Sequence, residues 1–282
     1  GDFTQDVFDL RTHTVADTVN TSMGDLQFLN RTMIGVVGSR HATVQGIRHA
    51  HDFSAALSCA GVTVSSGLAA GIDAAAHEGA LTGGGSTVAV VGTGLDKVYP
   101  ARHKELAHRI AEKGCIISEY PLGTSPVPAN FPRRNRLISG LATGVLVVEA
   151  AAQSGSLITA RMAAEQGRDV FAIPGSIHAP LSKGCHQLIR QGAKLVESAS
   201  DILEDLPQNI VASVKPEQST EPKREPVSTE DWAGCLGYDP VALDVLSQQT
   251  ELSIADLQSR LLVLELTGQI EMLPGGYVRK LN

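Results

Sequence analysis

MIGVVGSR, residues 33–40, decides the fold, because it joins a continuous apolar run directly to a glycine turn. A run that is apolar at successive rather than alternate positions is typical of a strand buried on both faces. The same order of short apolar run, glycine-rich turn and helical stretch recurs through residues 31–199. Repeated units of this kind favour parallel strands joined by helices that pack on the sheet.

The predicted fold class is therefore α/β, an extended Rossmann-like, mostly parallel sheet with helices on both faces. We expect strands at 33–37, 62–65, 87–91, 115–119, 144–149, 169–173 and 194–196. We expect helices at 44–59, 72–81, 103–113, 158–166 and 185–191.

The C-terminal part of the chain has a different composition. Residues 207–237 are dominated by Pro, Glu, Lys, Ser and Thr, which predicts a flexible linker. The segment after it indicates three helices and then a hairpin around Pro274-Gly275-Gly276, the plan of a winged helix. The expected parts are an N-terminal extension (1–30), a Rossmann-like domain (31–206), the linker (207–237) and a winged-helix domain (238–282).

The net charge of −7 hides an uneven distribution. Residues 1–30 carry −4 and residues 200–282 carry −8, whereas residues 31–199 hold sixteen bases against eleven acids, a net charge of +5. An acidic average therefore does not exclude a polyanionic ligand, because the predicted sheet domain is basic.

Several classes of protein lose support from what the sequence lacks. There is no apolar run near the roughly 20 residues of a membrane helix and no signal peptide, and the four cysteines are scattered. The dinucleotide fingerprint, the phosphate loop and the nucleophile elbow are absent. We therefore expect a cytoplasmic protein with no membrane span, metal or cofactor, and several common classes of enzyme lose support.

The first candidate binding turn is Gly38-Ser39-Arg40, which directly follows the strand at 33–37. We expect a helix to begin just beyond it, so that its N–H groups and dipole attract an anion while Arg40 adds a guanidinium fork. The alternative is an ordinary turn with a solvated arginine.

The second candidate turn, residues 65–73, contributes Ser66, Gly67 and Gly71, which would let a backbone approach closely. Asp73 and His77 follow, four residues apart on one predicted helix face. They form either a catalytic dyad or, on the more conservative interpretation, a capping aspartate and a packed histidine.

The most informative stretch runs from Asn130 to Arg136, and no acid occurs between Pro121 and Val148. An aromatic ring that stacks a base, next to guanidinium groups that contact phosphates, is what single-strand binding requires. The candidates in this predicted loop are Asn130, Phe131, Arg133, Arg134, Asn135 and Arg136. The alternative is a helix N-terminus with solvated arginines.

Two later turns complete the set. Ser154, Gly155 and Ser156 precede a predicted helix and offer a phosphate seat, unless they only cap that helix. Lys183 stands before the next predicted helix. Since the carboxyl ends of parallel strands meet at one edge of a sheet, we expect all these turns to form one basic, glycine-lined groove.

These motifs, in this order, resemble those of the DprA/Smf family. The resemblance rests on Gly35–Arg40, Ser66-Gly67 with Gly71-Ile72-Asp73, Asn130–Arg136, Ser154–Leu157 and Gly192-Ala193. It implies a Rossmann-like core that binds single-stranded DNA in natural transformation, a homodimer, assistance in loading the recombinase RecA, and no enzymatic turnover. It places DNA contacts on Arg40, on Phe131 with the arginines that follow it, and on Lys183.

Two other functions stay open. The core more distantly resembles Rossmann-like nucleotide hydrolases related to phosphoribohydrolases, in which case Glu149 would be the catalytic acid. A protein adaptor is the other alternative, because the expected third helix of the winged-helix domain, near residues 259–268, has Arg260 as its only base and also carries Glu265.

Overall fold

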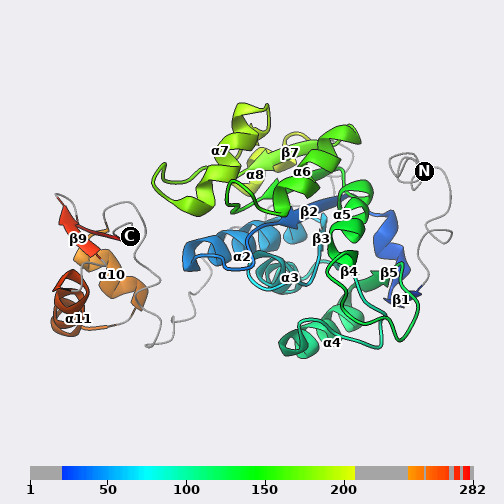
Figure 1. The fold of residues 1–282 in the computed structure, drawn as a ribbon, viewed down its shortest axis with the longest axis horizontal. Helices are drawn as coiled ribbons and strands as arrows, with labels where there is room; N and C mark the ends of the chain where they lie inside the picture. The colour runs from blue at the N-terminus through cyan, green and yellow to red at the C-terminus, as the bar shows by residue number, and fades with distance from the viewer. Residues whose placement is uncertain (1–20, 207–240, 251, 267–269, 274–275, 280–282) are drawn as a thin grey trace. The chain divides into compact units, whose positions relative to one another are not determined.

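The computed structural model describes residues 21–206, 241–250, 252–266, 270–273 and 276–279. The chain divides into two compact units, a larger one that holds an eight-stranded sheet and a smaller one that holds the C-terminal helices and hairpin (Figure 1). The linker predicted at 207–237 lies outside the described residues, as do residues 1–20 of the expected N-terminal extension.

The large sheet has the strand order β1-β5-β4-β3-β2-β6-β7-β8. Every neighbouring pair is parallel except β1 and β5, which are antiparallel. The strands are β1 (Thr21–Gly24), β2 (Met33–Val37), β3 (Thr63–Ser66), β4 (Thr87–Val91), β5 (Cys115–Ser118), β6 (Gly144–Val147), β7 (Asp169–Ala172) and β8 (Lys194–Leu195).

Helices cover both faces of the sheet. The α-helices of this unit are α2 (Val44–Cys59), α3 (Ile72–Thr82), α4 (Lys104–Lys113), α5 (Asn130–Leu141), α6 (Ser156–Glu165), α7 (Lys183–Arg190) and α8 (Ala199–Leu203). Short 3-10 turns lie at η3 (Leu26–Asn30), η4 (Ala101–His103) and η5 (Pro180–Ser182).

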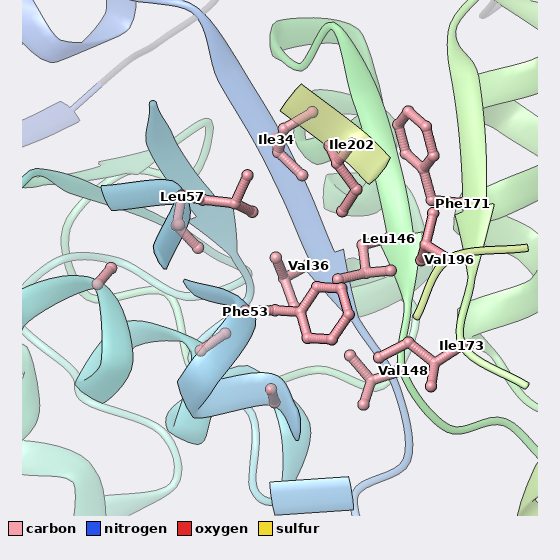
Figure 2. Packing of buried hydrophobic residues seen from close by; sticks show 14 of the residues in the cluster. Ile34, Val36, Phe53, Leu57, Leu146, Val148, Phe171, Ile173, Val196 and Ile202 are labelled. Atoms are coloured by element: carbon pink, nitrogen blue, oxygen red, sulfur yellow. The ribbon is translucent and has the colours of Figure 1, made fainter. Parts of the chain in front are cut away.

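The continuous apolar strands are buried on both faces, as their pattern predicts. In β2, Met33 and Val37 belong to the core under α5, α6 and α7, whereas Ile34 and Val36 belong to the opposite core. Figure 2 shows that opposite core, where Phe53 and Leu57 of α2 pack with Val36, Leu146 of β6 and Phe171 of β7. A third cluster lies under α4 and includes Leu106 and Ile110.

The predicted strands and helices are present, with ends that shift by at most two residues. The strand expected at 144–149 ends at Val147, and the helix expected at 158–166 begins at Ser156. Helix α2 spans Val44–Cys59, as predicted, and begins four residues beyond Arg40. Strand β1, within the expected N-terminal extension, was not predicted and adds an edge strand to the sheet.

Helix α5 is the main difference from expectation, because Asn130–Leu141 was predicted to start as a loop. Pro132 is tolerated here because it lies in the first helical turn, where backbone N–H groups have no intrahelical partner. Leu137, Ile138 and Leu141 then recur at helical spacing and are buried against the sheet. The arginines therefore project from a fixed helix and not from a loop.

The C-terminal unit contains α10 (Leu243–Thr250), α11 (Ile254–Leu266) and the antiparallel hairpin of β9 (Ile270–Leu273) and β10 (Gly276–Arg279). The hairpin is where the sequence predicts it. The small core of this C-terminal unit consists of Leu246, Leu257, Leu261 and Ile270. The described residues between 241 and 273 form two helices where three were expected, and the third expected helix, near 259–268, overlaps the second half of α11. In α11, Arg260 is half-buried and Glu265 exposed.

Candidate functional site

The strand order changes direction next to β2. The chain passes from β2 through β3 and β4 to β5 on one side and then returns to place β6 on the other side. In open α/β sheets, ligands bind in the crevice beyond the carboxyl ends of strands at such a switch point. The position of this crevice could not be predicted from the sequence, because it depends on the strand order.

A pocket of about 460 Å³ lies at this switch point. Its walls come from the turns after β2, β3 and β6 and from the first turns of α5 and α6. The lining residues are Val37, Gly38, Ser39, Arg40, Ala69, Asp73, Phe131, Pro132, Arg134, Asn135, Ile138, Ala151, Gln153, Ser154, Gly155, Ser156, Ile158 and Thr159. The structure therefore brings together four of the five stretches that the sequence singled out.

Arg40 and Phe131 form the exposed rim of the pocket. The Arg40 guanidinium carbon lies 5.8 Å from the centroid of the Phe131 ring, within the range of a cation–π interaction. Arg40 is exposed and the Phe131 ring is half-buried. The pair places a positive charge over an aromatic ring, and these two groups suit a phosphate and a base of one nucleotide.

Arg134 lies below this rim and is only 4% exposed. One Nη group donates a hydrogen bond to the Val90 carbonyl oxygen at 2.5 Å. Burial lowers the pKa of Arg134 to about 10, and the nearby Asp73 carboxylate opposes that shift. The expectation that Arg134 offers an exposed phosphate contact therefore needs correction, since its guanidinium is part of the pocket floor.

Asp73 is buried beside Arg134. Burial raises its pKa, whereas the Arg134 charge and the backbone N–H groups of Ala69 and Gly67 lower it. A buried carboxylate needs such partners because an isolated charge is costly in a low-dielectric interior. The Asp73–Arg134 pair thus has a structural explanation.

The other polar residues of α5 differ in how accessible they are. Arg133 is exposed and Asn135 is half-buried in the pocket wall. Arg136 pairs with the half-buried Glu119, and Asn130 is buried and donates from Nδ2 to the Gly92 carbonyl oxygen at 3.1 Å. Of the α5 candidates, Phe131 and Arg133 are therefore the most available to a ligand.

The turn after β3 also serves packing. The Ser66 side chain is fully buried and its hydroxyl donates to the Val36 carbonyl oxygen at 2.6 Å, so the structure does not place it where a ligand reaches it. A Cβ at Gly67 would overlap the Arg134 guanidinium. Gly71 has φ +75°, and a Cβ there would overlap the Ser39 carbonyl oxygen. At both glycines the close approach that we expected from a ligand is made instead by the protein itself, by Arg134 at Gly67 and by Ser39 at Gly71.

The serines at the start of α6 are already engaged with the protein. The Ser156 amide donates to the Ser154 hydroxyl oxygen at 3.2 Å, and the Ser156 hydroxyl donates to the Gly38 carbonyl oxygen at 2.8 Å. Gly155 is exposed at the helix N-cap. Fewer groups are therefore available to a phosphate at this helix start than the sequence predicted. Ser154 and Gly155 still line the pocket, and the positive end of the helix dipole points there.

Lys183 is exposed and is the first residue of α7, but it is not among the residues that line the pocket. The next residue, Gly184, donates from its amide to the Ala150 carbonyl oxygen at 2.8 Å, beside the pocket residue Ala151. Lys183 therefore lies at the same edge of the sheet but does not line the pocket.

The residues of the two catalytic alternatives, His77 and Glu149, make contacts that explain them structurally. His77 is fully buried and its Nδ1 lies 2.7 Å from the Thr87 hydroxyl, not beside Asp73, so the two do not form a dyad. Burial lowers the His77 pKa to about 3. Glu149 does not line the pocket, and its carboxylate packs against Gly46 of α2.

One neighbour of the site was not predicted. Tyr99, in the turn after β4, places its ring centroid 5.5 Å from that of Phe131 at an interplanar angle of 36°. The signal in the sequence was an aromatic residue in a glycine-containing turn after a strand, Gly92 to Pro100.

Within the described residues, no group of three or more His, Cys, Asp or Glu side chains could hold a metal ion. None of the described helices combines the length and the apolarity that crossing a bilayer requires.

Comparison with known proteins identifies the family. The family described as DNA recombination-mediator protein A matches residues 11–207, and the DprA winged helix domain matches residues 215–276. Protein Smf of Escherichia coli is 44% identical over 267 residues, which cover 91% of this chain and 70% of that protein. DNA processing protein DprA of Streptococcus pneumoniae is 51% identical over 180 residues, 64% of each chain.

Solved structures agree with these matches. DNA processing protein A of S. pneumoniae superposes with a TM-score of 0.64 at 48% identity, over 66% of this chain and 65% of the other. DNA processing protein A of Helicobacter pylori, whose structure is described for its single-stranded DNA binding mode, superposes with a TM-score of 0.62 at 28% identity, over 67% of this chain and 86% of the other. The chain thus spans 64–70% of the matched E. coli and S. pneumoniae proteins.

The fold and site define an open α/β protein with a cationic, aromatic-rimmed pocket at its switch point, joined to a winged-helix domain. Within that class, the chain belongs to the DNA recombination-mediator protein A family. The resemblance to the DprA/Smf family is confirmed, and with it a place among DNA-processing proteins.

Proposed function

We propose that this protein binds single-stranded DNA across the switch-point pocket, without turnover of the DNA. The Arg40–Phe131 pair carries the proposal, because a guanidinium and an aromatic face 5.8 Å apart match the phosphate and base of one nucleotide. The described single-stranded DNA binding mode of the H. pylori relative supports it.

The residues proposed to contact DNA are ranked by their accessibility. Arg40, Phe131, Arg133 and Lys183 come first, because these side chains are exposed or form the rim. The pocket walls at Gly38, Ser39, Asn135, Ser154 and Gly155 come next. Arg134 and Ser156 also line the pocket but are buried, and the remaining candidates are not among the lining residues: Ser66, Gly67, Gly71, Asn130 and Arg136.

Family membership supports the wider role. We propose that the protein protects incoming single strands in natural transformation and recombination, helps to load RecA, and acts as a cytoplasmic homodimer. We also propose that residues 31–206 form the DNA-binding domain, that 207–237 link it to the winged-helix domain at 238–282, and that residues 1–30 extend the first domain.

The test is a titration of labelled single-stranded and duplex DNA of equal length at several salt concentrations. We expect tighter binding of the single strand, weak sequence preference and a strong salt dependence. Equal affinity for the two forms at every salt concentration would contradict the proposal.

A second measurement addresses turnover. We expect no release of free base from nucleoside monophosphates, by wild type or by the Glu149→Ala variant. Release that depends on Glu149 would favour the hydrolase instead.

A further inference from the structure

Tyr99 lies next to the proposed site but is far more exposed than a packing residue needs to be. Its ring contacts Phe131, with the centroids 5.5 Å apart, yet 51% of the residue remains accessible. A tyrosine that only supported a neighbouring ring would be expected to bury most of its own surface. Half of this large, flat side chain instead faces solvent at the edge of the pocket.

Hydrogen bonds before and after Tyr99 hold the turn that carries it. After it, the His103 amide donates to the Pro100 carbonyl oxygen at 3.0 Å. The Asn130 amide group donates to the Gly92 carbonyl oxygen at 3.1 Å, which ties the turn to α5. The Thr93 hydroxyl donates to the Lys97 carbonyl oxygen at 2.8 Å, which closes the turn on itself. An aromatic ring on a fixed turn loses little conformational freedom on binding, which favours its use as a stacking surface.

Positive charge continues directly beyond Tyr99. Arg102 and Lys104 are both exposed, at η4 and at the start of α4, and no acid occurs from Lys97 to Lys104. Arg40 and Tyr99 both contact Phe131, and Arg102 and Lys104 follow Tyr99 closely in the sequence, before the exposed Glu105. Alternating cations and aromatic rings form the kind of path that single-stranded nucleic acids follow.

We propose that Tyr99 stacks a second base, next to the base on Phe131, and directs the strand from the pocket toward Arg102 and Lys104. This inference rests on the proposed function, because it extends the same single-strand site by one nucleotide and assigns its exit. It predicts that Tyr99 and Phe131 act on different bases, although their rings touch.

The test is a double-mutant cycle with a fluorescent oligothymidylate at low salt. The variants are Phe131→Ala, Tyr99→Leu and both together, with Tyr99→Phe as the matched control. Leucine keeps apolar bulk against Phe131 but has no flat face, whereas phenylalanine keeps the face. Thermal melting of each full-length variant checks that it folds.

We expect Tyr99→Leu to weaken binding about 5-fold or more in both the wild-type and the Phe131→Ala background. Tyr99→Phe should bind within about 2-fold of wild type, because phenylalanine keeps the aromatic face on which a base stacks. An effect of Tyr99→Leu that disappears in the Phe131→Ala background would overturn the inference, because Tyr99 would then act only through Phe131. Equal binding by wild type and Tyr99→Leu would also overturn it.

The proposed function has its own failure condition, which is that the wild-type protein does not bind the oligothymidylate.

The path toward Arg102 and Lys104 is tested by a separate measurement. Replacing Arg102 and Lys104 with alanine should reduce the slope of log affinity against log salt by about 0.7 for each phosphate that the variant no longer neutralises. Lys113→Ala, at the far end of α4, is the control and should leave the slope unchanged.

Discussion

The guanidinium of Arg40 lies over the ring of Phe131, although one residue follows β2 and the other begins α5. We predict that Arg40→Ala and Phe131→Ala each weaken binding of single-stranded DNA, by about 1–3 kcal/mol for the aromatic ring. The double variant should lose less than the sum of the two, because each residue positions the other. Equilibrium binding at one salt concentration measures all four proteins of this cycle.

The chain offers a matched control for that pair. Arg31 lies over the Phe28 ring at 4.7 Å, a similar contact at η3, before the start of β2. Arg31→Ala should bind DNA like wild type. A loss equal to that of Arg40→Ala would mean that general positive charge, and not the switch-point pocket, determines affinity.

Salt dependence should separate the two roles at the rim. Arg40→Ala and Lys183→Ala should each lower the slope of log affinity against log salt by about 0.7, since each removes a cation that neutralises a phosphate. Phe131→Ala should weaken binding with the slope unchanged, because stacking releases no counterion. Titrations at four or more salt concentrations provide the slopes, and identical slopes for all variants would contradict these assignments.

Arg134 should contribute more to the stability of the fold than to the positive charge that DNA would meet, because its side chain is buried. Arg134→Met leaves the buried Asp73 without its cationic partner, so we expect a loss of about 3–5 kcal/mol in the free energy of unfolding. The same substitution combined with Asp73→Asn should lose less. Urea unfolding measures each variant. Arg133→Ala, at the exposed neighbouring position, should change stability by no more than about 0.5 kcal/mol.

Buried His77 should make stability depend on pH. Its pKa is about 3 in the folded protein because burial disfavours the charged ring, against 6.5 for an exposed histidine. Between these values the unfolded chain binds one more proton, so acidification stabilises the unfolded state. This residue should therefore contribute a loss of about 1.4 kcal/mol for each pH unit below 6.5, until the folded pKa is reached.

Denaturant unfolding at several pH values measures that contribution. His77→Gln should show a shallower pH dependence than wild type by about one proton, even where it is less stable overall. Parallel pH profiles for the two proteins would show that His77 does not titrate in this way.

The sequence predicted the layers of the fold well, and the reasons are local. Continuous apolar runs such as 33–37 and 87–91 match β2 and β4, and the amphipathic stretch 44–59 matches α2. Strand order could not be predicted in this way, because nothing local to β6 specifies that it pairs with β2. The pocket follows from that pairing.

The site was predicted only in part, for a related reason. Phe131 and Arg40 were identified because turns after strands share one edge of a parallel sheet. The burial of Arg134 depends on the Val90 carbonyl oxygen and on Asp73, which are distant in sequence. A helix start at Asn130 was kept only as the alternative, because proline and three arginines favour a loop interpretation when the sheet beneath is unknown.

The hydrogen bond from the Ser156 hydroxyl to the Gly38 carbonyl oxygen joins the turn after β2 to the start of α6. The two sides of the crevice are therefore fastened to each other underneath any bound strand. A strand bound there would therefore rest on a floor that exists before binding. Its residence time would depend on the side chains above that floor, and a protein that received the strand would not need to remodel the domain.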